Sequence, residues 1–159
     1  GKGVARAASL ALGMEVWIAS RPGGEPRAGR HDLDELLSQL DVLSLHCPLT
    51  TLTQGLIGAP QLARMKPDAL LINTARGALV DSQALADALR AGRLGGAAID
   101  VLPQEPPVDG NTLLAPDIPH LIVTPHIAWA AREARQRCLD EMAANVEDLA
   151  RGGHRGRVV

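Results

Sequence analysis

An arginine, a glutamate and a histidine stand at positions where they could bind an anion and exchange a proton. Arg76, Glu105 and His126 each come shortly after an apolar run of the kind that forms a buried strand. An arginine can bind a planar carboxylate through two hydrogen bonds. A histidine exchanges protons near neutral pH, and a nearby carboxylate favours its charged form. The three side chains would suit proton transfer to an oxygen of a bound acid, although their spacing alone does not show that they meet.

The stretch that leads to Arg76 is the most informative part of the chain. The apolar residues 69–72 predict a strand buried on both faces, as in a parallel sheet covered by helices. Polar residues begin at Asn73, where this strand should end. Gly77 then permits a tight turn, and Asp81 can cap the following helix. Taken alone, Arg76 is equally consistent with an ordinary exposed loop arginine.

Apolar runs alternate with helical patterns along the whole chain. We expect strands at residues 14–19, 41–46, 69–72, 95–101 and 120–124, and helices at 4–12, 32–40, 59–65, 82–91 and 128–151. This alternation predicts an α/β fold, with a doubly wound parallel sheet. Ligands of such sheets bind outside the carboxyl ends of the strands, which is where the three candidate side chains are expected.

The composition is typical of a folded domain and gives no indication of a strongly charged partner. The 159 residues are 46% hydrophobic with a net charge of −2, so we expect neither disorder nor a nucleic-acid partner. No apolar run is long enough to span a membrane, and no signal peptide is visible. Cys47 and Cys138 lack the spacing of a metal or redox site, and a disulfide between them is open but not indicated. We therefore expect no metal and a cytoplasmic location.

Several motifs together resemble the D-isomer-specific 2-hydroxyacid dehydrogenases. They are Ile-Asn-Thr-Ala-Arg-Gly at residues 72–77 with Val80-Asp81, Ala-Ile-Asp-Val at 98–101 with Glu105-Pro106, and Thr-Pro-His-Ile-Ala at 124–128. The resemblance runs in the right order from Gly1 to about Arg151. Residues 126–130 and 133–137 are most similar to the glycerate dehydrogenase or hydroxypyruvate reductase branch.

The resemblance implies a Rossmann-type oxidoreductase that transfers hydride between NAD(P)H and a small 2-oxo acid, such as hydroxypyruvate or glyoxylate. Arg76 would bind the carboxylate and the carbonyl oxygen of the substrate. His126 would donate a proton to that oxygen as hydride reaches the carbon. Glu105 would hydrogen-bond His126 and keep it protonated. By the same resemblance the protein would be a homodimer.

The resemblance also implies a set of coenzyme contacts. Asp100 and the backbone at Thr74 and Ala75 would contact the nicotinamide amide, although Asp100 is also consistent with an ordinary acid at a strand end. His46 and Pro48 would line the adenosine pocket, with His46 equally consistent with a hydrogen-bonded loop histidine. The remaining candidates are Thr53 as a phosphate contact, and Arg76, His126 and Ala128 beside the coenzyme.

Gly1 matches the third glycine of the dinucleotide loop G-x-G-x-x-G, although residues 1–3 are also consistent with a flexible start. On this match the first strand, the first two glycines and the substrate domain lie outside the sequence. We therefore expect residues 1–151 to form an N-terminally incomplete coenzyme domain that is inactive alone. Residues 152–159 would be a tail that returns towards the substrate domain.

Ser20 and Arg21 stand about 20 residues after this glycine, where NAD-specific members carry an aspartate for the ribose hydroxyls. Without that acid nothing repels a 2′-phosphate, and Ser20 with Arg21 can bind one, assisted by Arg27 or Arg30. We therefore predict use of NADP or of both coenzymes. The alternative is a solvated Arg21 with NAD bound through other contacts.

Two other functions are consistent with the same motifs. One is a dinucleotide-sensing corepressor or binding module, in which the coenzyme controls assembly. The other is a phosphoglycerate or sugar-phosphate dehydrogenase, which would need cationic residues in the substrate domain. Turnover by the full-length protein separates the first of these from the oxidoreductase.

Overall fold

The computed structural model describes residues 1–20, 22–25 and 27–156, and the chain divides into two compact units. The first unit is Gly1–Pro125 and the second is His126–Val159.

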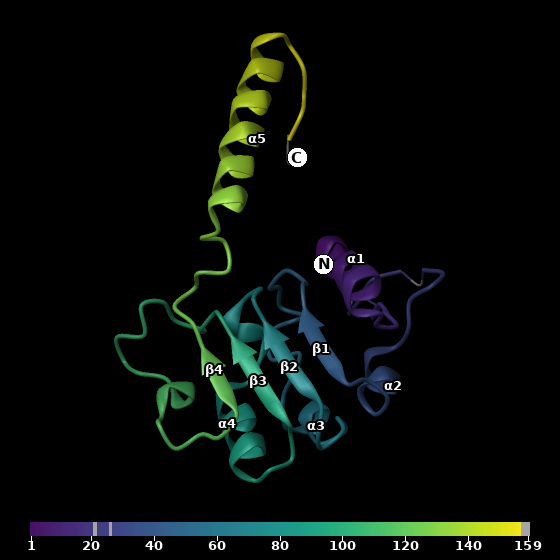
Figure 1. The fold of residues 1–159 in the computed structure, drawn as a ribbon, viewed down its shortest axis with the longest axis vertical. Helices are drawn as coiled ribbons and strands as arrows, with labels where there is room; N and C mark the ends of the chain where they lie inside the picture. The colour runs from purple at the N-terminus through teal and green to yellow at the C-terminus, as the bar shows by residue number, and fades with distance from the viewer. Residues whose placement is uncertain (21, 26, 157–159) are drawn as a thin grey trace. The chain divides into compact units, whose positions relative to one another are not determined.

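The first unit is built on a four-stranded parallel sheet in the order β1-β2-β3-β4 (Figure 1). The strands are β1 (Val42–Leu45), β2 (Leu70–Asn73), β3 (Gly96–Ile99) and β4 (Leu121–Val123). Parallel neighbours need crossover connections, and helices lie in the connections between β1, β2 and β3. The predicted parallel α/β fold is confirmed, and its strands lie within the predicted ranges or extend them by one residue.

Local capping signals place the helices of this unit. They are α1 (Lys2–Leu12), α2 (Leu33–Leu37), α3 (Ala59–Leu62) and α4 (Ser82–Arg90), with short 3-10 helices η1 (Gly77–Leu79) and η2 (Thr112–Leu114). The Asp81 carboxylate accepts hydrogen bonds from the N–H groups of Gln83 and Ala84, both at 3.0 Å, and so caps α4 as predicted. Gly13, with a φ of 64°, ends α1 as predicted.

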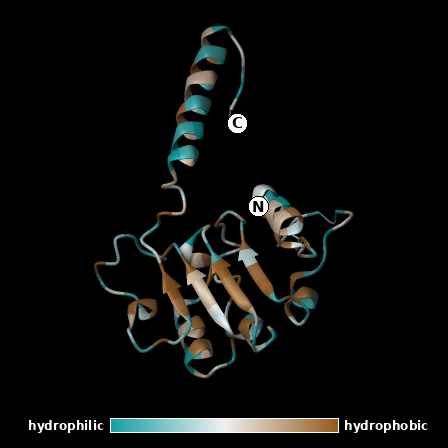
Figure 2. Ribbon diagram, viewed as in Figure 1, coloured by the Kyte–Doolittle hydropathy of each residue, from teal (hydrophilic) through white to brown (hydrophobic). Residues whose placement is uncertain are grey.

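The core of the first unit lies between one face of the sheet and helices α3 and α4. Leu71 of β2 and Leu85 of α4 are fully buried, and Ile99 of β3 is 2% exposed. Figure 2 shows the apolar character of the strands. Aliphatic side chains and one methionine fill this core, because the chain contains no Phe and no Tyr.

The prediction that residues 69–72 are buried on both faces was wrong for the first unit. Leu71 and Asn73 are fully buried, but Leu70 is 44% exposed and Ile122 of β4 is 64% exposed. Side chains alternate between the faces of a strand, and the strand register places Leu70 and Ile122 on one face. That face is less buried because α3 and α4 both contribute to the core on the opposite face.

The prediction of a buried strand at residues 14–19 was also wrong. Only Ala19 pairs, through a parallel bridge to His31, and Trp17 and Ile18 are 42% and 47% exposed. A strand forms only where a second strand pairs along its length. Within the described residues, the pairing of this segment is limited to the backbone hydrogen bonds around His31.

The second unit contains the long helix α5 (Arg132–Ala150). The helix was predicted to begin at residue 128, but a turn comes first, in which the Ala130 N–H donates to the Ile127 carbonyl at 2.8 Å. After α5 the described tail returns along the helix, and the Arg155 guanidinium donates to both carboxylate oxygens of Glu141 at 2.9 and 3.0 Å. Among the described helices, none is long and apolar enough to cross a membrane.

Candidate functional site

The loop that follows β2 carries Arg76 at the carboxyl end of the strand, where the sequence predicted it. The Asn73 side chain is fully buried and bonds this loop twice. Its Oδ1 accepts from the Ala75 N–H at 3.0 Å, and its Nδ2 donates to the Arg76 carbonyl at 2.9 Å. The exposed Arg76 guanidinium donates from Nη1 to the Ala75 carbonyl at 2.7 Å. Asn73 therefore fixes the backbone from which Arg76 projects.

Gly77 brings the loop after β2 against the loop after β3. A Cβ atom at Gly77 would collide with the backbone of Leu102 and Pro103, so only glycine fits here without a shift. The Leu102 N–H in turn donates to Glu105 Oε1 at 2.7 Å. Arg76 and Glu105 therefore stand on two loops that touch through backbone atoms.

Asp100 directly follows β3 and is hydrogen-bonded at the carboxyl ends of β2 and β4. Its residue is 4% exposed, and its N–H donates to the Asn73 carbonyl at 2.9 Å. Its carboxylate accepts a hydrogen bond from the Thr124 hydroxyl, which follows β4. Thr124 was not predicted as a site residue, although its place directly after an apolar strand was a usable signal. The carboxyl ends of β2, β3 and β4 thus form one connected polar edge.

His126 lies in the second unit and has an unusual backbone conformation. Its φ is 54°, in the left-handed region that non-glycine residues rarely adopt. The Trp129 indole Nε1–H donates to the His126 carbonyl at 2.6 Å, and Trp129 is 60% exposed. The pairing of His126 with Glu105 stays a prediction, as does the place of Ala128 beside the coenzyme. The sequence did not indicate the contact between Trp129 and His126.

Gly1 and His46 lie side by side at the carboxyl end of β1. A Cβ at Gly1 would come within 3.3 Å of the His46 Cβ. His46 Nε2 lies 2.9 Å from the Ser44 hydroxyl oxygen. Partial burial lowers the pKa of His46 from its ordinary value. A bare glycine at the start of α1 leaves backbone N–H groups open to an anion.

Hydrogen bonds join the chain around Ser20 to the chain around Arg30, ahead of α2. The Ser20 N–H donates to the His31 carbonyl at 2.7 Å, and Arg30 Nη1 donates to the Ala19 carbonyl at 3.0 Å. Arg21 lies outside the described residues. Arg30 therefore holds a cationic group next to Ser20.

Thr53 has a structural role in the turn after β1. It is 2% exposed, and its hydroxyl donates to the Pro48 carbonyl at 2.8 Å and accepts from the Thr50 N–H at 2.8 Å. Pro48 itself is exposed. A phosphate contact by Thr53 stays a prediction, and the hydroxyl would have to give up its hydrogen bond to the Pro48 carbonyl to donate one to a phosphate oxygen.

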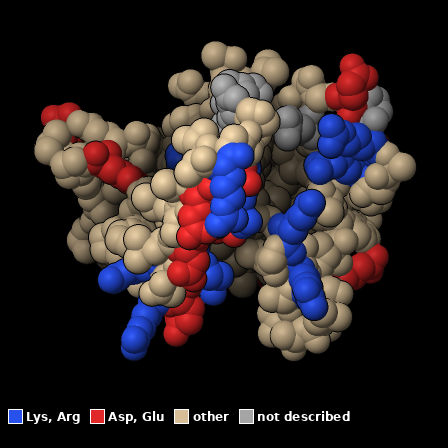
Figure 3. All heavy atoms as spheres, turned by 90° about the horizontal axis from the view of Figure 1, so that it is seen from above, with Lys and Arg blue, Asp and Glu red and all other residues tan. Residues whose placement is uncertain are grey.

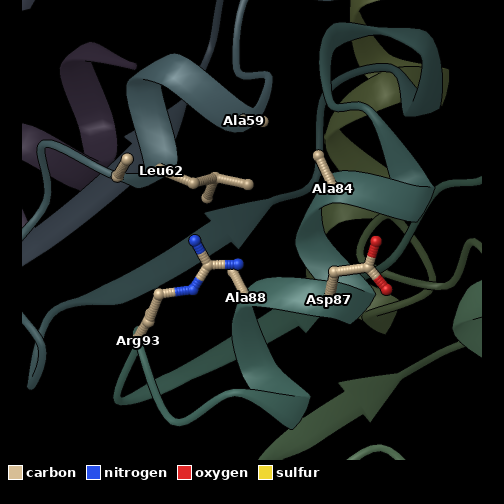
Figure 4. A pocket seen from close by; sticks show the side chains of 7 residues that line it. Ala59, Leu62, Ala84, Asp87, Ala88 and Arg93 are labelled. Atoms are coloured by element: carbon tan, nitrogen blue, oxygen red, sulfur yellow. The ribbon is translucent and has the colours of Figure 1, made fainter.

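A small hollow of about 110 Å³ lies between α3 and α4 (Figure 4). Its lining is largely apolar, with one acid and one base: Ala59, Leu62, Ala63, Ala84, Asp87, Ala88 and Arg93. None of the predicted site residues lines it. The hollow therefore belongs to the helical layer and not to the carboxyl edge of the sheet.

The surface charge is mixed. On the face drawn in Figure 3, basic and acidic side chains lie interspersed. This agrees with the net charge of −2 and shows no extended basic area of the kind that binds nucleic acid on that face.

A parallel sheet with polar loops at its carboxyl edge and a glycine opening the first helix is typical of dinucleotide-binding α/β domains. Comparison with known proteins gives the family. Residues 1–128 match the D-isomer specific 2-hydroxyacid dehydrogenase, NAD binding domain, and the chain belongs to this family.

Relatives of known name and structure agree with this. Glycerate dehydrogenase of Methylorubrum extorquens is 51% identical over 152 residues, covering 96% of this chain and 47% of the relative. The NAD-complexed D-isomer specific 2-hydroxyacid dehydrogenase of Lactobacillus delbrueckii ssp. bulgaricus superposes with a TM-score of 0.79 at 35% identity, covering 100% of this chain and 52% of that one. An acyclic imino acid reductase in complex with NADPH and D-Arg superposes with a TM-score of 0.77 at 33% identity, covering 96% and 48%. The chain spans about half the length of the curated relatives it matches.

Proposed function

We propose that this chain is the coenzyme-binding part of a longer dehydrogenase, with residues 1–151 as the domain and 152–159 as its tail. The full-length protein would reduce small 2-oxo acids, converting hydroxypyruvate to D-glycerate and glyoxylate to glycolate. Family membership and 51% identity to a glycerate dehydrogenase support this activity. The observation that carries it is Arg76, held at the carboxyl end of β2 on a loop that touches the loop of Glu105.

The residues of the first unit fit a dinucleotide. A Cβ atom at Gly1 would lie 3.3 Å from the Cβ of His46, so the absence of a side chain leaves space there. Gly1 precedes the first turn of α1, where backbone N–H groups can bind phosphate oxygens. When bound, the coenzyme supplies the hydride. Asp100 and the backbone at Thr74 and Ala75 would orient its nicotinamide amide.

The chain's own side chains would handle the substrate. Arg76 would bind the carboxylate and polarise the carbonyl oxygen. His126, in its imidazolium form, would donate the proton that this oxygen gains when the carbonyl carbon accepts hydride. Glu105 would hydrogen-bond His126 and stabilise its positive charge. The product is the 2-hydroxy acid, and His126 is left neutral.

The preference for NADP, or use of both coenzymes, is part of the proposal. Ser20 stands where an aspartate would repel a 2′-phosphate, and Arg30 holds its guanidinium beside Ser20 through the Ala19 carbonyl. Arg21, outside the described residues, would contribute a second cation. A structural relative in complex with NADPH shows that this fold accepts the phosphorylated coenzyme in that protein.

We also propose a cytoplasmic homodimer. The chain has two cysteines without the spacing of a disulfide framework, which suits a reducing compartment. The assembly is checked by analytical ultracentrifugation of the full-length protein. A dinucleotide-sensing corepressor finds no support in the relatives reported above, which are named as dehydrogenases and a reductase.

The test is the rate of NADPH and NADH oxidation by the full-length protein with hydroxypyruvate and with glyoxylate. We expect turnover with both acids and a higher kcat/KM for NADPH than for NADH. A higher kcat/KM for NADH would leave the enzyme function standing and overturn the coenzyme preference. Absence of turnover with both acids and both coenzymes would overturn the proposed function.

A further inference from the structure

The Asn73 carboxamide is engaged on both of its polar ends by one short loop. Oδ1 accepts from the Ala75 N–H at 3.0 Å and Nδ2 donates to the Arg76 carbonyl at 2.9 Å. Because Asn73 is fully buried, water does not substitute for either bond. Only a side chain with a donor and an acceptor on one planar group can make both contacts.

The same residue also ties the loop to the next strand. The Asn73 carbonyl accepts from the Asp100 N–H at 2.9 Å, so the backbone at the end of β2 is anchored to the end of β3. Asn73 therefore fixes the Arg76 loop through its side chain, and its backbone carbonyl joins the end of β2 to the end of β3.

The loop cannot relax freely on its other side. Gly77 lies so close to Leu102 and Pro103 that a Cβ would collide with their backbone. Leu102 is the residue whose N–H binds Glu105. A shift in the Ala75–Arg76 backbone would therefore move the Arg76 guanidinium relative to the Glu105 loop.

We propose that Asn73 is a positioning residue for the 2-oxo acid: its carboxamide sets the place of Arg76 and thereby the affinity for the substrate carboxylate. The inference rests on the proposed function, because it takes Arg76 as the carboxylate-binding group. Because Asn73 is fully buried, it would act through the backbone of Arg76 and not by direct contact with the substrate.

The decisive experiment is a double-mutant cycle in the full-length protein. Asn73→Ala alone should raise the KM for hydroxypyruvate roughly tenfold, because a displaced guanidinium loses its two-point contact. Arg76→Ala should raise the same KM at least as much. In the Arg76→Ala background, Asn73→Ala should change KM by less than about twofold, since coupled residues do not act additively.

Two further variants separate positioning from a general loss of stability. Asn73→Asp keeps the acceptor for the Ala75 N–H and loses the donor to the Arg76 carbonyl, so its KM should lie between those of the wild type and Asn73→Ala. Leu71→Ala, on the same strand and equally buried, should lower the melting temperature without changing KM.

The outcomes are distinct. A KM change in Asn73→Ala that persists in full in the Arg76→Ala background would overturn the proposal, as would an equal KM change in Leu71→Ala. Failure of both Asn73 variants to fold would make the residue purely structural and overturn it as well.

Failure of the proposed function is visible separately, as absence of turnover in the wild type. In that case the dissociation constant for oxalate, a small planar dicarboxylate, is measured by titration calorimetry for the wild type and for each variant of the cycle. Oxalate binding that is unchanged in Arg76→Ala or Asn73→Ala would overturn the positioning role. Coupled losses in the two variants would support it without any turnover.

Discussion

The Thr124 hydroxyl donates a hydrogen bond to the Asp100 carboxylate across the carboxyl ends of β4 and β3. Asp100 is 4% exposed, and a carboxylate this buried is costly to keep without hydrogen-bond donors. The resemblance places Asp100 against the nicotinamide. The hydrogen bond joins this acid to Thr124, which precedes His126 by two residues. Thr124 therefore supports the polar edge of the sheet without itself being a candidate for chemistry.

Replacing Thr124 should affect stability and coenzyme binding together. Thr124→Val keeps the shape and removes the donor, so we expect a loss of about 1–3 kcal/mol in the free energy of unfolding. The dissociation constant for NADPH should rise several-fold, because the Asp100 carboxylate loses the hydrogen bond from the Thr124 hydroxyl. Thr124→Ser restores the hydroxyl and should recover both quantities. Urea unfolding and fluorescence titration of the full-length protein provide the measurements, and equal behaviour of the Val and Ser variants would contradict the role of the hydroxyl.

Gly77 should not tolerate even one added methyl group. Gly77→Ala places its Cβ into the backbone of Leu102 and Pro103, and we expect a loss of about 1–3 kcal/mol in stability. Gly3→Ala in α1 is the matched control, because nothing lies within 4 Å of its Cβ. That control should be neutral or should stabilise by up to about 1 kcal/mol, since alanine favours helix. Melting temperatures of the two variants compare them directly, and equal values would show that the contact at Gly77 is absent.

Trp129 should matter for turnover through the backbone of His126. Trp129→Phe removes the indole N–H that holds the His126 carbonyl and keeps an aromatic ring. If His126 is the proton donor as proposed, we expect kcat to fall roughly threefold to tenfold, because a small displacement of the donor slows proton transfer. Trp17→Phe is the control, since its indole N–H donates instead to the exposed Glu15 carboxylate. Steady-state kinetics that give the same kcat for both variants would remove Trp129 from this role.

His46 should make the protein less stable as the pH falls. Partial burial lowers the pKa of His46 below its ordinary value of 6.5. Below about pH 6.5 the unfolded chain therefore binds more protons at this position than the folded chain, and the free energy of unfolding decreases. His46→Asn should lose less stability than the wild type between pH 7.5 and pH 5.5. Since His46 stays partly exposed, we expect a small difference, measured by urea unfolding at the two pH values; an identical loss in both proteins would refute it.

The chain's local signals were enough for much of the fold. Asp81 predicted the start of α4, and Gly13 predicted the end of α1, because capping depends on neighbours in the sequence. The apolar runs predicted β1 to β4 as parallel strands. The motifs around Arg76, Glu105 and His126 predicted the family, which the comparison with known proteins confirmed.

Contacts between distant segments were beyond the reach of the sequence. Residues 14–19 have the composition of a strand, yet only Ala19 pairs, because a strand needs a partner along its length. Leu70 is as apolar as Leu71, and its exposure depends on which face the helices cover. The sequence by itself determined the parallel α/β fold, the helix ends at Gly13 and Asp81, and the family. It also predicts which residues would carry the chemistry. Only the tertiary structure decided that residue 77 must lack a side chain, that Asn73 hydrogen-bonds the Arg76 loop and that Thr124 hydrogen-bonds Asp100. Each of these contacts depends on side chains and loops that folding brings together.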